Sequence, residues 1–303
     1  NTLDREDIFR EIFEIFTEKR VLPDGMTRTR VEQISRSFLK KQKYFEEIQD
    51  KLTIISGRPG TGKTIKLLRM AMDLTSNHDA RCLILSYNKA LTSDIKRTLH
   101  HTSLRKVDEK IVVKTIHKFI YDLLRDFEIV SSHPKDFTYN YEEYLKELKE
   151  YIHTGAISEE DIKEVKEKNS ADIAFDHILV DEGQDSNILE KEILFSLFGE
   201  NHVIVTEGPN QMVRGGKECV WEEGMTKDRY NKVYEKIGLR QKSNLVNFVN
   251  SFANSKNLDW SVDIKEDLLG GNIVISNQDY STGSQHKELE EQCIKDGNEP
   301  YDM

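Results

Sequence analysis

The stretch Leu52-Thr-Ile-Ile-Ser-Gly-Arg-Pro-Gly-Thr-Gly-Lys-Thr64 decides the fold. It begins with an apolar and β-branched run, Leu52 to Ile55, that is typical of a buried strand. Residues 57–64 then fit the pattern G-x-x-x-x-G-K-[ST], and an apolar series typical of a helix follows from Ile65 to Met72. Strand, glycine loop and helix in this order predict a phosphate-binding loop.

The spacing within this loop suits a polyphosphate. Glycines let backbone N–H groups turn inward without a Cβ in the way, and the helix that starts near Gly62 directs its positive end at the same phosphates. Lys63 supplies a mobile positive charge, and the Thr64 hydroxyl is a ligand for Mg²⁺. A glycine loop that only turns the chain is the alternative, which the flanking strand and helix disfavour. The predicted nucleotide-binding residues are Gly57, Arg58, Pro59, Gly60, Thr61, Gly62, Lys63 and Thr64.

Length and composition bound the class of protein. The 303 residues are enough for one large domain or two. No run of 18 apolar residues and no basic-then-apolar amino end occurs, so we expect no membrane span and no secretion signal. The chain starts at Asn1 rather than Met, and we expect the true amino terminus to lie outside it. Three cysteines without zinc-site spacing predict reduced thiols of a cytoplasmic protein: Cys82, Cys219 and Cys293.

The net charge of −10 argues weakly against nucleic acid as a partner, because phosphate binding favours a basic surface. A local basic stripe on an acidic protein is sufficient, however. Five basic residues lie close together in sequence: Lys89, Lys96, Arg97, Arg105 and Lys106. On charge alone, this cluster fits a nucleic-acid contact and a solvated helix face equally well.

Strands and helices are predicted to alternate along most of the chain. Amphipathic helices are expected over residues 4–19 and 31–48, before the phosphate loop. Beyond the loop we predict strands at residues 81–87, 111–113, 176–181 and 202–206, with helices after the first two. This alternation predicts a mostly parallel sheet covered on both faces, with ligands at the carboxyl ends of its strands.

Other stretches depart from the alternation. Residues 128–172 predict a small helical insertion, with one helix ended by Gly155 and a second started by the capping box Ser158-Glu-Glu-Asp161. Residues 222–236 are polar and have no assigned element. A helix is predicted over residues 239–253 and a strand over residues 272–276, after which the polar sequence predicts no further element.

Two adjacent carboxylates end the strand at residues 176–181. In a protein with a phosphate loop, Asp181 is expected to hold Mg²⁺ through water, and Glu182 to orient and deprotonate an attacking water. Two acids at a strand end are commonly only solvated, and this is the alternative. The glycine loop upstream favours the functional interpretation.

In this order, the motifs resemble those of superfamily 1 helicases of the UvrD/Rep/PcrA type. Residues 57–64 look like motif I, and Gln42 sits where the adenine-reading Q motif of that family would be. Leu179-Val-Asp-Glu-Gly-Gln-Asp185 is similar to the V-D-E-x-Q-D of that family, and this is the most specific match. Weaker similarities cover Leu85-Ser-Tyr-Asn-Lys-Ala90, Thr115-Ile-His117, Gln211 and Arg240-Gln-Lys-Ser-Asn-Leu-Val246.

The resemblance implies an α/β fold of the RecA-like P-loop NTPase type, in which two such domains clasp Mg²⁺ and ATP. We expect N-terminal helices over residues 1–50, a first RecA-like domain over 51–237, and the start of a truncated second one over 238–303. The resemblance assigns catalytic roles to Lys63, Glu182, Gln211 and Arg240, and Mg²⁺ to Thr64 and Asp181.

The resemblance also implies single-stranded DNA as the partner, with RNA less favoured. Residues that would face the strand are Tyr87, Asn88, Lys89, Thr115 and His117. For His117, a hydrogen-bonded histidine at a helix start is the alternative interpretation.

The chain departs from the helicase pattern at three places. Glu207-Gly208 replaces the Gly-Asp of motif III, and no stacking aromatic follows Gln211; Trp221 is either its substitute or a core residue. Gly238-Leu239 replaces the usual Asn-Tyr before Arg240, and nothing in residues 256–303 matches motifs V and VI. Two functions therefore remain: a DNA-dependent ATPase that translocates on DNA, and a nucleotide-switched regulatory or defence module that binds a protein partner without unwinding DNA.

Overall fold

The computed structural model describes residues 48, 50–101, 110–130, 137–168, 173–209, 211, 217–239, 241–258, 261–264, 273 and 283–295. The predicted helices over 4–19 and most of 31–48 lie outside these residues, as do Gln42, Arg240 and most of the strand predicted over 272–276. The chain divides into two compact units, Asn1–Arg240 and Gln241–Met303. Each unit is described by itself.

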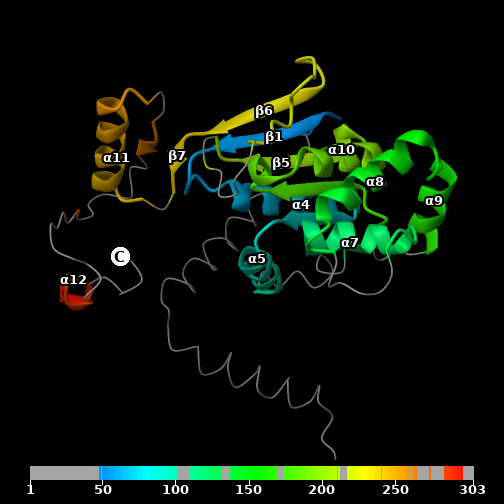
Figure 1. Ribbon diagram of the computed structural model, residues 1–303. Coiled ribbons are helices and arrows are strands. Elements are labelled where there is room, and N and C mark those ends of the chain that lie inside the picture. Colours follow the sequence, from blue (N-terminus) through cyan, green and yellow to red (C-terminus); the bar gives the residue numbers. More distant parts are fainter. Residues whose placement is uncertain are drawn as a thin grey trace, which may run out of the picture. The chain divides into compact units, whose positions relative to one another are not determined.

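The first unit is built on a parallel sheet of six described strands in the order β3-β2-β4-β5-β1-β6 (Figure 1). Four of these strands are wholly buried or nearly so along their length, which explains their apolar sequences. The bounds are β1 Leu52–Gly57, β2 Cys82–Ser86, β3 Ile111–Thr115, β4 His177–Asp181, β5 Val203–Glu207 and β6 Tyr230–Glu235.

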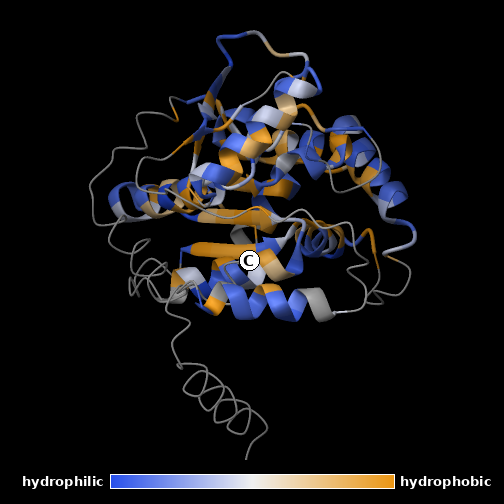
Figure 2. Ribbon diagram, turned by 90° about the vertical axis from the view of Figure 1, so that its left-hand side faces the viewer, coloured by the Kyte–Doolittle hydropathy of each residue, from blue (hydrophilic) through white to orange (hydrophobic). Residues whose placement is uncertain are grey.

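Helices cover both faces of this sheet, and successive strand residues alternate between two hydrophobic clusters. Ile54 packs in one cluster and Ile55 in the other, as the two-residue period of a strand requires. Figure 2 shows the hydrophobic strands between helices whose outer sides are hydrophilic. One cluster packs against α4 (Lys63–His78) and α5 (Lys89–His101), and the other against α7 (Ile116–Asp126), α8 (Tyr141–Thr154) and α10 (Ile188–Phe198).

The predicted fold class is confirmed: the unit is an α/β structure with a parallel sheet, consistent with a RecA-like P-loop fold. Helices α8 and α9 (Glu159–Lys168) lie within residues 128–172. Gly155 ends α8 in the left-handed conformation, at φ 75°. The Ser158 backbone N–H donates to Asp161 Oδ2 (2.8 Å), and the Asp161 N–H donates to Ser158 Oγ (3.1 Å), so the predicted capping box begins α9.

Two elements of the first unit escape the sequence analysis. The polar segment 222–236 contains β6, which pairs with β1 in parallel register from Leu52↔Tyr230 to Gly57↔Glu235. As an edge strand it pairs on one side only, so most of its side chains stay half-buried and its sequence lacks an apolar run. Helix α10 carries apolar residues on several sides and shows no amphipathic pattern to reveal it.

The second unit contains α11 (Ser243–Ser255), β8 (Asp263–Ile264) and α12 (Ser284–Lys295). Asn250 joins α11 to the segment before β8, because its side chain donates to Val262 O (2.9 Å) and accepts from Val262 N (3.0 Å). The prediction that no element follows residue 276 is wrong, since α12 forms there from a polar helix-forming sequence. Nowhere in the described part of either unit is a helix long and apolar enough to cross a membrane.

A half-buried histidine, His177, lies at the amino end of β4. His177 packs against His202, with ring centroids 5.5 Å apart, and its Nδ1 has no hydrogen-bond partner among the described residues. The pKa of His177 is lowered to about 4, mainly by burial; the charges of His202 and His78 act in the same direction, while Asp176 opposes them. His177 is therefore neutral in the folded protein at pH 7.

We predict that this histidine makes the protein sensitive to acid. Between about pH 6.5 and pH 4 the unfolded chain binds a proton at His177 that the folded protein does not, so stability present above pH 6.5 is lost as the pH falls. His177→Gln, which cannot titrate, should lose about 2 kcal/mol less between pH 7 and pH 4.5 in urea unfolding than the unmodified chain. Equal losses in the two proteins would contradict this assignment.

Candidate active site

The phosphate loop connects β1 to α4 at the carboxyl edge of the sheet. Gly60 and Gly62 have φ values of 80° and 86°, in the left-handed region that glycine adopts without strain. A Cβ on Gly57 would lie 2.7 Å from the backbone oxygen of Glu235 and 2.7 Å from Thr61 Oγ1. Neighbouring atoms therefore leave no room for a side chain at Gly57.

Lys63, the first residue of α4, is buried against this loop. Its ammonium group donates hydrogen bonds to the backbone oxygens of Gly57 (2.9 Å) and Arg58 (3.3 Å). These carbonyls hold the charge at the amino end of α4, where the helix dipole also attracts an anion. A polyphosphate that entered the loop would meet the Lys63 charge and the backbone N–H groups together.

Asp181 is buried at the end of β4 and binds two threonines. Thr64 Oγ1 of α4 donates to Asp181 Oδ2 (3.0 Å), and Thr206 Oγ1 of β5 donates to Asp181 Oδ1. Burial raises the pKa of the Asp181 carboxyl, and the hydrogen bonds from Thr206 and Thr64 act in the opposite direction. Three neighbouring elements thus meet at one carboxylate.

The oxygen ligands at Asp181 suit a Mg²⁺ ion whose coordination is completed by water and phosphate, rather than a metal ion coordinated by protein side chains alone. Thr64 and Asp181 present hydroxyl and carboxylate oxygens, which are the ligand types that Mg²⁺ prefers. Across the described residues, no group of three or more histidines, cysteines or acids could hold a metal. Such a site depends on water and phosphate for its remaining ligands, as Mg²⁺–nucleotide sites do.

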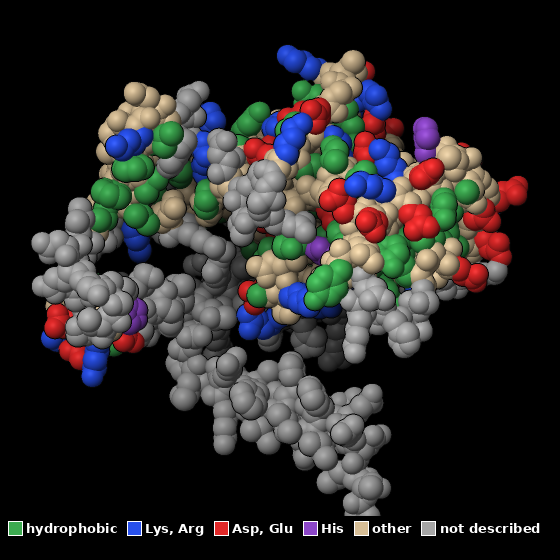
Figure 3. Space-filling model, in the orientation of Figure 1, with side chains coloured by type: hydrophobic (Ala, Val, Ile, Leu, Met, Phe, Trp, Pro, Cys, Tyr) green, Lys and Arg blue, Asp and Glu red, His purple; other side chains and the backbone are tan. Residues whose placement is uncertain are grey.

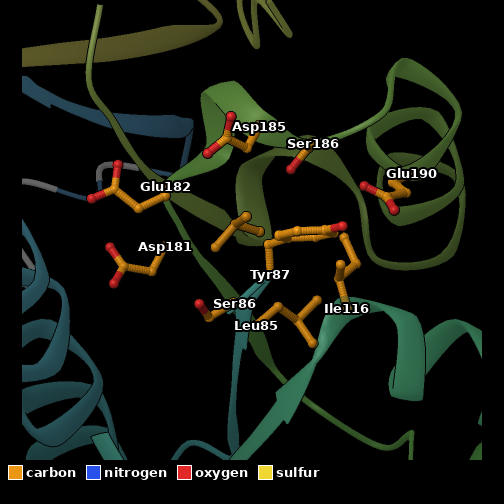
Figure 4. Close-up of a pocket in the computed structure, with 10 residues that line it drawn as sticks. Leu85, Ser86, Tyr87, Ile116, Asp181, Glu182, Asp185, Ser186 and Glu190 are labelled. Carbon is orange, nitrogen blue, oxygen red and sulfur yellow. The ribbon is translucent and has the colours of Figure 1, made fainter. Parts of the chain in front are cut away.

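Glu182 follows Asp181 in a left-handed conformation, with φ 55° and ψ 48°. A non-glycine residue rarely adopts this backbone, and such strain gathers at functional sites. The Glu182 N–H donates to Thr206 Oγ1 (3.1 Å), and Gln184 Nε2 donates to Glu182 Oε2 (2.8 Å). Figure 4 shows the carboxylates of Asp181 and Glu182 pointing to the same side, away from Tyr87.

The turn after Glu182 leaves no room for a side chain at Gly183. A Cβ there would lie 2.3 Å from Val205 Cγ1 and 2.7 Å from Trp221 Nε1. Trp221 is fully buried, and its indole N–H donates to the Gly183 backbone oxygen (2.9 Å). Trp221 is therefore a core residue, and the alternative that it stacks on a nucleic-acid base is wrong.

Gln211 lies beside the same turn. Its backbone N–H donates to Gly208 O (3.1 Å), and its side chain fills the space where a Cβ on Gly208 would be, 2.4 Å from Gln211 Oε1. Gln211 Nε2 is buried and has no hydrogen-bond partner among the described residues. A buried amide without a partner is costly, so this group is available for a ligand.

Two of the departures from the helicase pattern have a structural counterpart. The carboxylate of Glu207, displaced by one residue in motif III, forms an ion pair with Lys232 of β6 (2.8 Å). Leu239, which follows β7 (Ile237–Gly238), donates its backbone N–H to Gly60 O (2.8 Å). Glu207 thus shares the Lys232 ammonium of the edge strand with Glu222, and the segment before Arg240 contacts the phosphate loop.

Comparison with known protein families decides the assignment. A family described as an AAA domain (AAA_19) matches residues 40–217. The chain belongs to this family. The family is of the P-loop, UvrD-like helicase kind, which makes the chain a P-loop NTPase of a broadly superfamily 1 helicase-like type. A comparison with curated proteins found no match.

The residues predicted to face DNA follow β2 and β3, at the same edge of the AAA domain as the acids. Asn88 Oδ1 accepts from the Ala90 N–H (2.8 Å) at the start of α5, and Thr115 caps α7 by accepting from the Lys118 N–H (3.3 Å). Asn88 and Lys89 are exposed. Asn88 and Thr115 therefore have a structural role at helix starts, and their contact with DNA stays a prediction.

His117 lies in the first turn of α7, between two tyrosines. Its ring centroid is 5.0 Å from that of Tyr87 and 4.4 Å from that of Tyr141. Tyr87 is 40% exposed, so this aromatic group reaches the surface. Figure 4 shows a pocket beside Tyr87, lined also by Ile116, Ser186 and Glu190, with Asp181 and Glu182 at its other side.

Charge is unevenly distributed over the surface of the AAA domain. On the face seen in Figure 3, acidic side chains gather over α8 and α9. Of the basic cluster, Lys89, Lys96 and Arg97 lie exposed on α5, where Arg97 pairs with Asp94 (2.5 Å). Arg105 and Lys106 lie outside the described residues. The exposed lysines of α5 remain a candidate contact for a phosphate backbone.

The structure thus brings together Lys63, Thr64, Asp181, Glu182 and Gln211 within one unit, while Gln42 and Arg240 lie outside the described residues. Thr206 and the pairing of Gln184 with Glu182 escape the sequence analysis. For Thr206, no local motif marks the contact, because it depends on β5 lying beside β4.

We predict that Gly183→Ala destabilises the AAA domain by about 3 kcal/mol, because the added methyl group meets the buried Val205 and the indole of Trp221. Gly155→Ala is the matched control: its new methyl group has no neighbour within 4 Å, and only the φ of 75° opposes it, at about 1 kcal/mol. Urea unfolding of both variants measures the difference. A loss at Gly183 no larger than that at Gly155 would contradict the packing described.

Proposed function

We propose that the chain is an ATP hydrolase of the DNA helicase type, which couples Mg²⁺-dependent ATP hydrolysis to movement on single-stranded DNA. One observation carries the proposal: the carboxyl edge of one sheet presents the phosphate loop, the Asp181–Glu182 pair and the exposed Tyr87–His117 aromatic group side by side. Nucleotide chemistry and a surface for bases therefore share strands β2 and β4.

The residues that would hold the nucleotide are those of the loop. Backbone N–H groups of residues 57–62, except Pro59, and the Lys63 ammonium would bind the phosphates, and Thr64 with Asp181 would hold Mg²⁺. Bound Mg²⁺ supplies charge neutralisation on the transferred phosphoryl group. Glu182 would accept the proton of the attacking water, and Gln211 would contact the terminal phosphate through Nε2, which has no hydrogen-bond partner among the described residues.

The helicase resemblance adds two residues to the proposal. It implies that Gln42 recognises the adenine base. It also implies that Arg240 is an arginine finger, whose guanidinium stabilises charge on the phosphoryl group. On the nucleic-acid side, Tyr87 and His117 supply aromatic faces for bases, and Asn88, Lys89 and Thr115 supply polar contacts to the backbone.

A second function is a nucleotide-switched module that regulates a protein partner without unwinding DNA. The ion pair between Glu207 and Lys232 favours it, because the displaced motif III carboxylate is occupied within the domain. The net charge of −10 also favours it. Both functions require nucleotide hydrolysis, and they differ in whether DNA accelerates it.

The experiment that separates them is ATP hydrolysis by the chain with and without single-stranded DNA, at low and at moderate salt. The proposal predicts a several-fold stimulation that weakens as salt rises, because phosphate contacts release counterions. Lys89→Ala should reduce the stimulation, whereas Lys146→Ala, at an exposed lysine of α8, should not. Hydrolysis that is indifferent to DNA would overturn the translocase and leave the regulatory module.

Two substitutions should separate binding from turnover. We predict that Lys63→Ala weakens ATP binding about 10- to 100-fold, the factor that corresponds to the loss of a charged hydrogen-bond donor. Glu182→Gln should retain binding and lose about 100-fold or more in kcat, because only the proton acceptor is removed. Titration with a fluorescent ATP analogue and a phosphate-release assay measure the two quantities. Full turnover by Glu182→Gln would show that Glu182 is not the base.

A further inference from the structure

Gln184 connects the proposed base to a distant turn. Its side chain is buried, at 2% exposure, and makes two hydrogen bonds: Nε2 donates to Glu182 Oε2 (2.8 Å), and Oε1 accepts from the Gly208 N–H (2.9 Å). We infer that Gln184 is a positioning residue, which fixes the Glu182 carboxylate and makes its position depend on the turn at Gly208. This inference rests on the proposed ATPase function.

The chemistry of the two partners permits one orientation of the Gln184 amide. The Gly208 N–H can only donate, so it must face the amide oxygen, and an ionised Glu182 can only accept, so it must face the NH₂ group. An inverted amide would lose both bonds. Glutamate at this position would keep the bond to Gly208 and oppose the Glu182 charge, and methionine would lose both bonds at similar volume.

The backbone around Gln184 is held at three points. The Glu182 N–H donates to Thr206 Oγ1 (3.1 Å), the Gly183 oxygen accepts from Trp221 Nε1 (2.9 Å), and the Gln184 oxygen accepts from the Cys219 N–H (3.1 Å). This backbone therefore has little freedom to follow a displacement. If Gly208 moved, its hydrogen bond to Gln184 would move the Gln184 side chain, and that side chain would displace the Glu182 carboxylate.

The turn at Gly208 contacts two parts of the nucleotide site. A hydrogen bond from the Gln211 N–H to Gly208 O (3.1 Å) closes the turn, and the Gln211 side chain packs directly on Gly208. From the phosphate loop, Arg58 Nη1 donates to Pro209 O (3.2 Å). A ligand that engages Gln211 or moves Arg58 would thus act on the same turn, one or two peptide groups beyond the Gly208 N–H that binds Gln184. The position of the Glu182 carboxylate would therefore depend on whether a nucleotide occupies the phosphate loop.

A double-mutant cycle tests whether Gln184 acts through Glu182. Gln184→Met should lower the DNA-independent kcat about 10- to 100-fold, the factor for one lost hydrogen bond to a charged group, while KM and the affinity for a fluorescent ATP analogue change less than about twofold. Gln184→Glu should lower kcat at least as much. In a Glu182→Gln background, Gln184→Met should cost no further turnover, because the group that it positions is already absent.

Tryptophan fluorescence gives a second readout, which reports on the turn at Gly183 and does not require ATP hydrolysis. The chain has two tryptophans, Trp221 and Trp260. In a Trp260→Phe background, the emission of Trp221 reports on the Gly183 turn through its bond to Gly183 O. We expect a nonhydrolysable ATP analogue to change this emission in the parent protein, and the change to be smaller in Gln184→Met at saturating analogue.

Controls separate positioning from folding and from failure of the proposed function. Asn187→Ala removes the cap of α10, next to this turn, and should lower the melting temperature with kcat unchanged. If the parent chain hydrolyses ATP and Gln184→Met keeps its kcat, or loses an equal factor in the Glu182→Gln background, the inference is overturned. If the parent chain itself binds but does not hydrolyse ATP, the proposed function fails first, and an unchanged Trp221 response in Gln184→Met then overturns the inference by itself.

Discussion

The hydrogen bonds around the buried Asp181 carboxylate are the constraint on which the rest of the site depends. Thr64 reaches it from α4, and Thr206 reaches it from β5, so the carboxylate joins the phosphate-loop helix to two central strands. A buried carboxylate is costly unless it is well hydrogen-bonded, and here both donors are hydroxyl groups that can also turn toward a metal. The same Thr206 hydroxyl accepts from the Glu182 N–H. The acid proposed to hold Mg²⁺ and the acid proposed to activate water are therefore positioned by one side chain.

The order of the strands determines which groups lie next to the Asp181 carboxylate. Strand β4 lies between β2 and β5, which places the Asp181–Glu182 pair between the Tyr87 side and the Gly208 side of the carboxyl edge. Strand β6 lies on the other side of β1, where its Lys232 pairs with Glu207 and Glu222. The segment after β6 contacts the phosphate loop through Leu239. The phosphate loop, the Tyr87–His117 aromatic group and the segment at Leu239 thus lie at one edge of the sheet.

Sequence reasoning recovers the features that are local in the chain. The apolar runs of β1, β2 and β4 require burial on both faces, and the glycine loop and the paired acids are contiguous motifs, so fold class and main site residues follow from them. Strand β6 could not be recovered, because its pairing with β1 rather than its own composition stabilises it. The hydrogen bonds from Thr206 to Asp181, from Trp221 to Gly183 and from Gly208 to Gln184 each span more than 20 residues of sequence, so no local motif marks them. The contact of Thr206 could be predicted only from the pairing of β5 with β4.

The central claim is that nucleotide and single-stranded DNA bind to coupled sites on this one sheet edge. The most direct measurement is the fluorescence anisotropy of a labelled oligonucleotide, titrated with the chain alone, with Mg²⁺ and a nonhydrolysable ATP analogue, and with Mg²⁺-ADP. We predict that the DNA dissociation constant differs by about fivefold or more between nucleotide states, and that Lys63→Ala reduces the difference at nucleotide concentrations that saturate only the parent protein. A dissociation constant that is the same in all three states, with the nucleotide demonstrably bound, would contradict the coupling of the two sites.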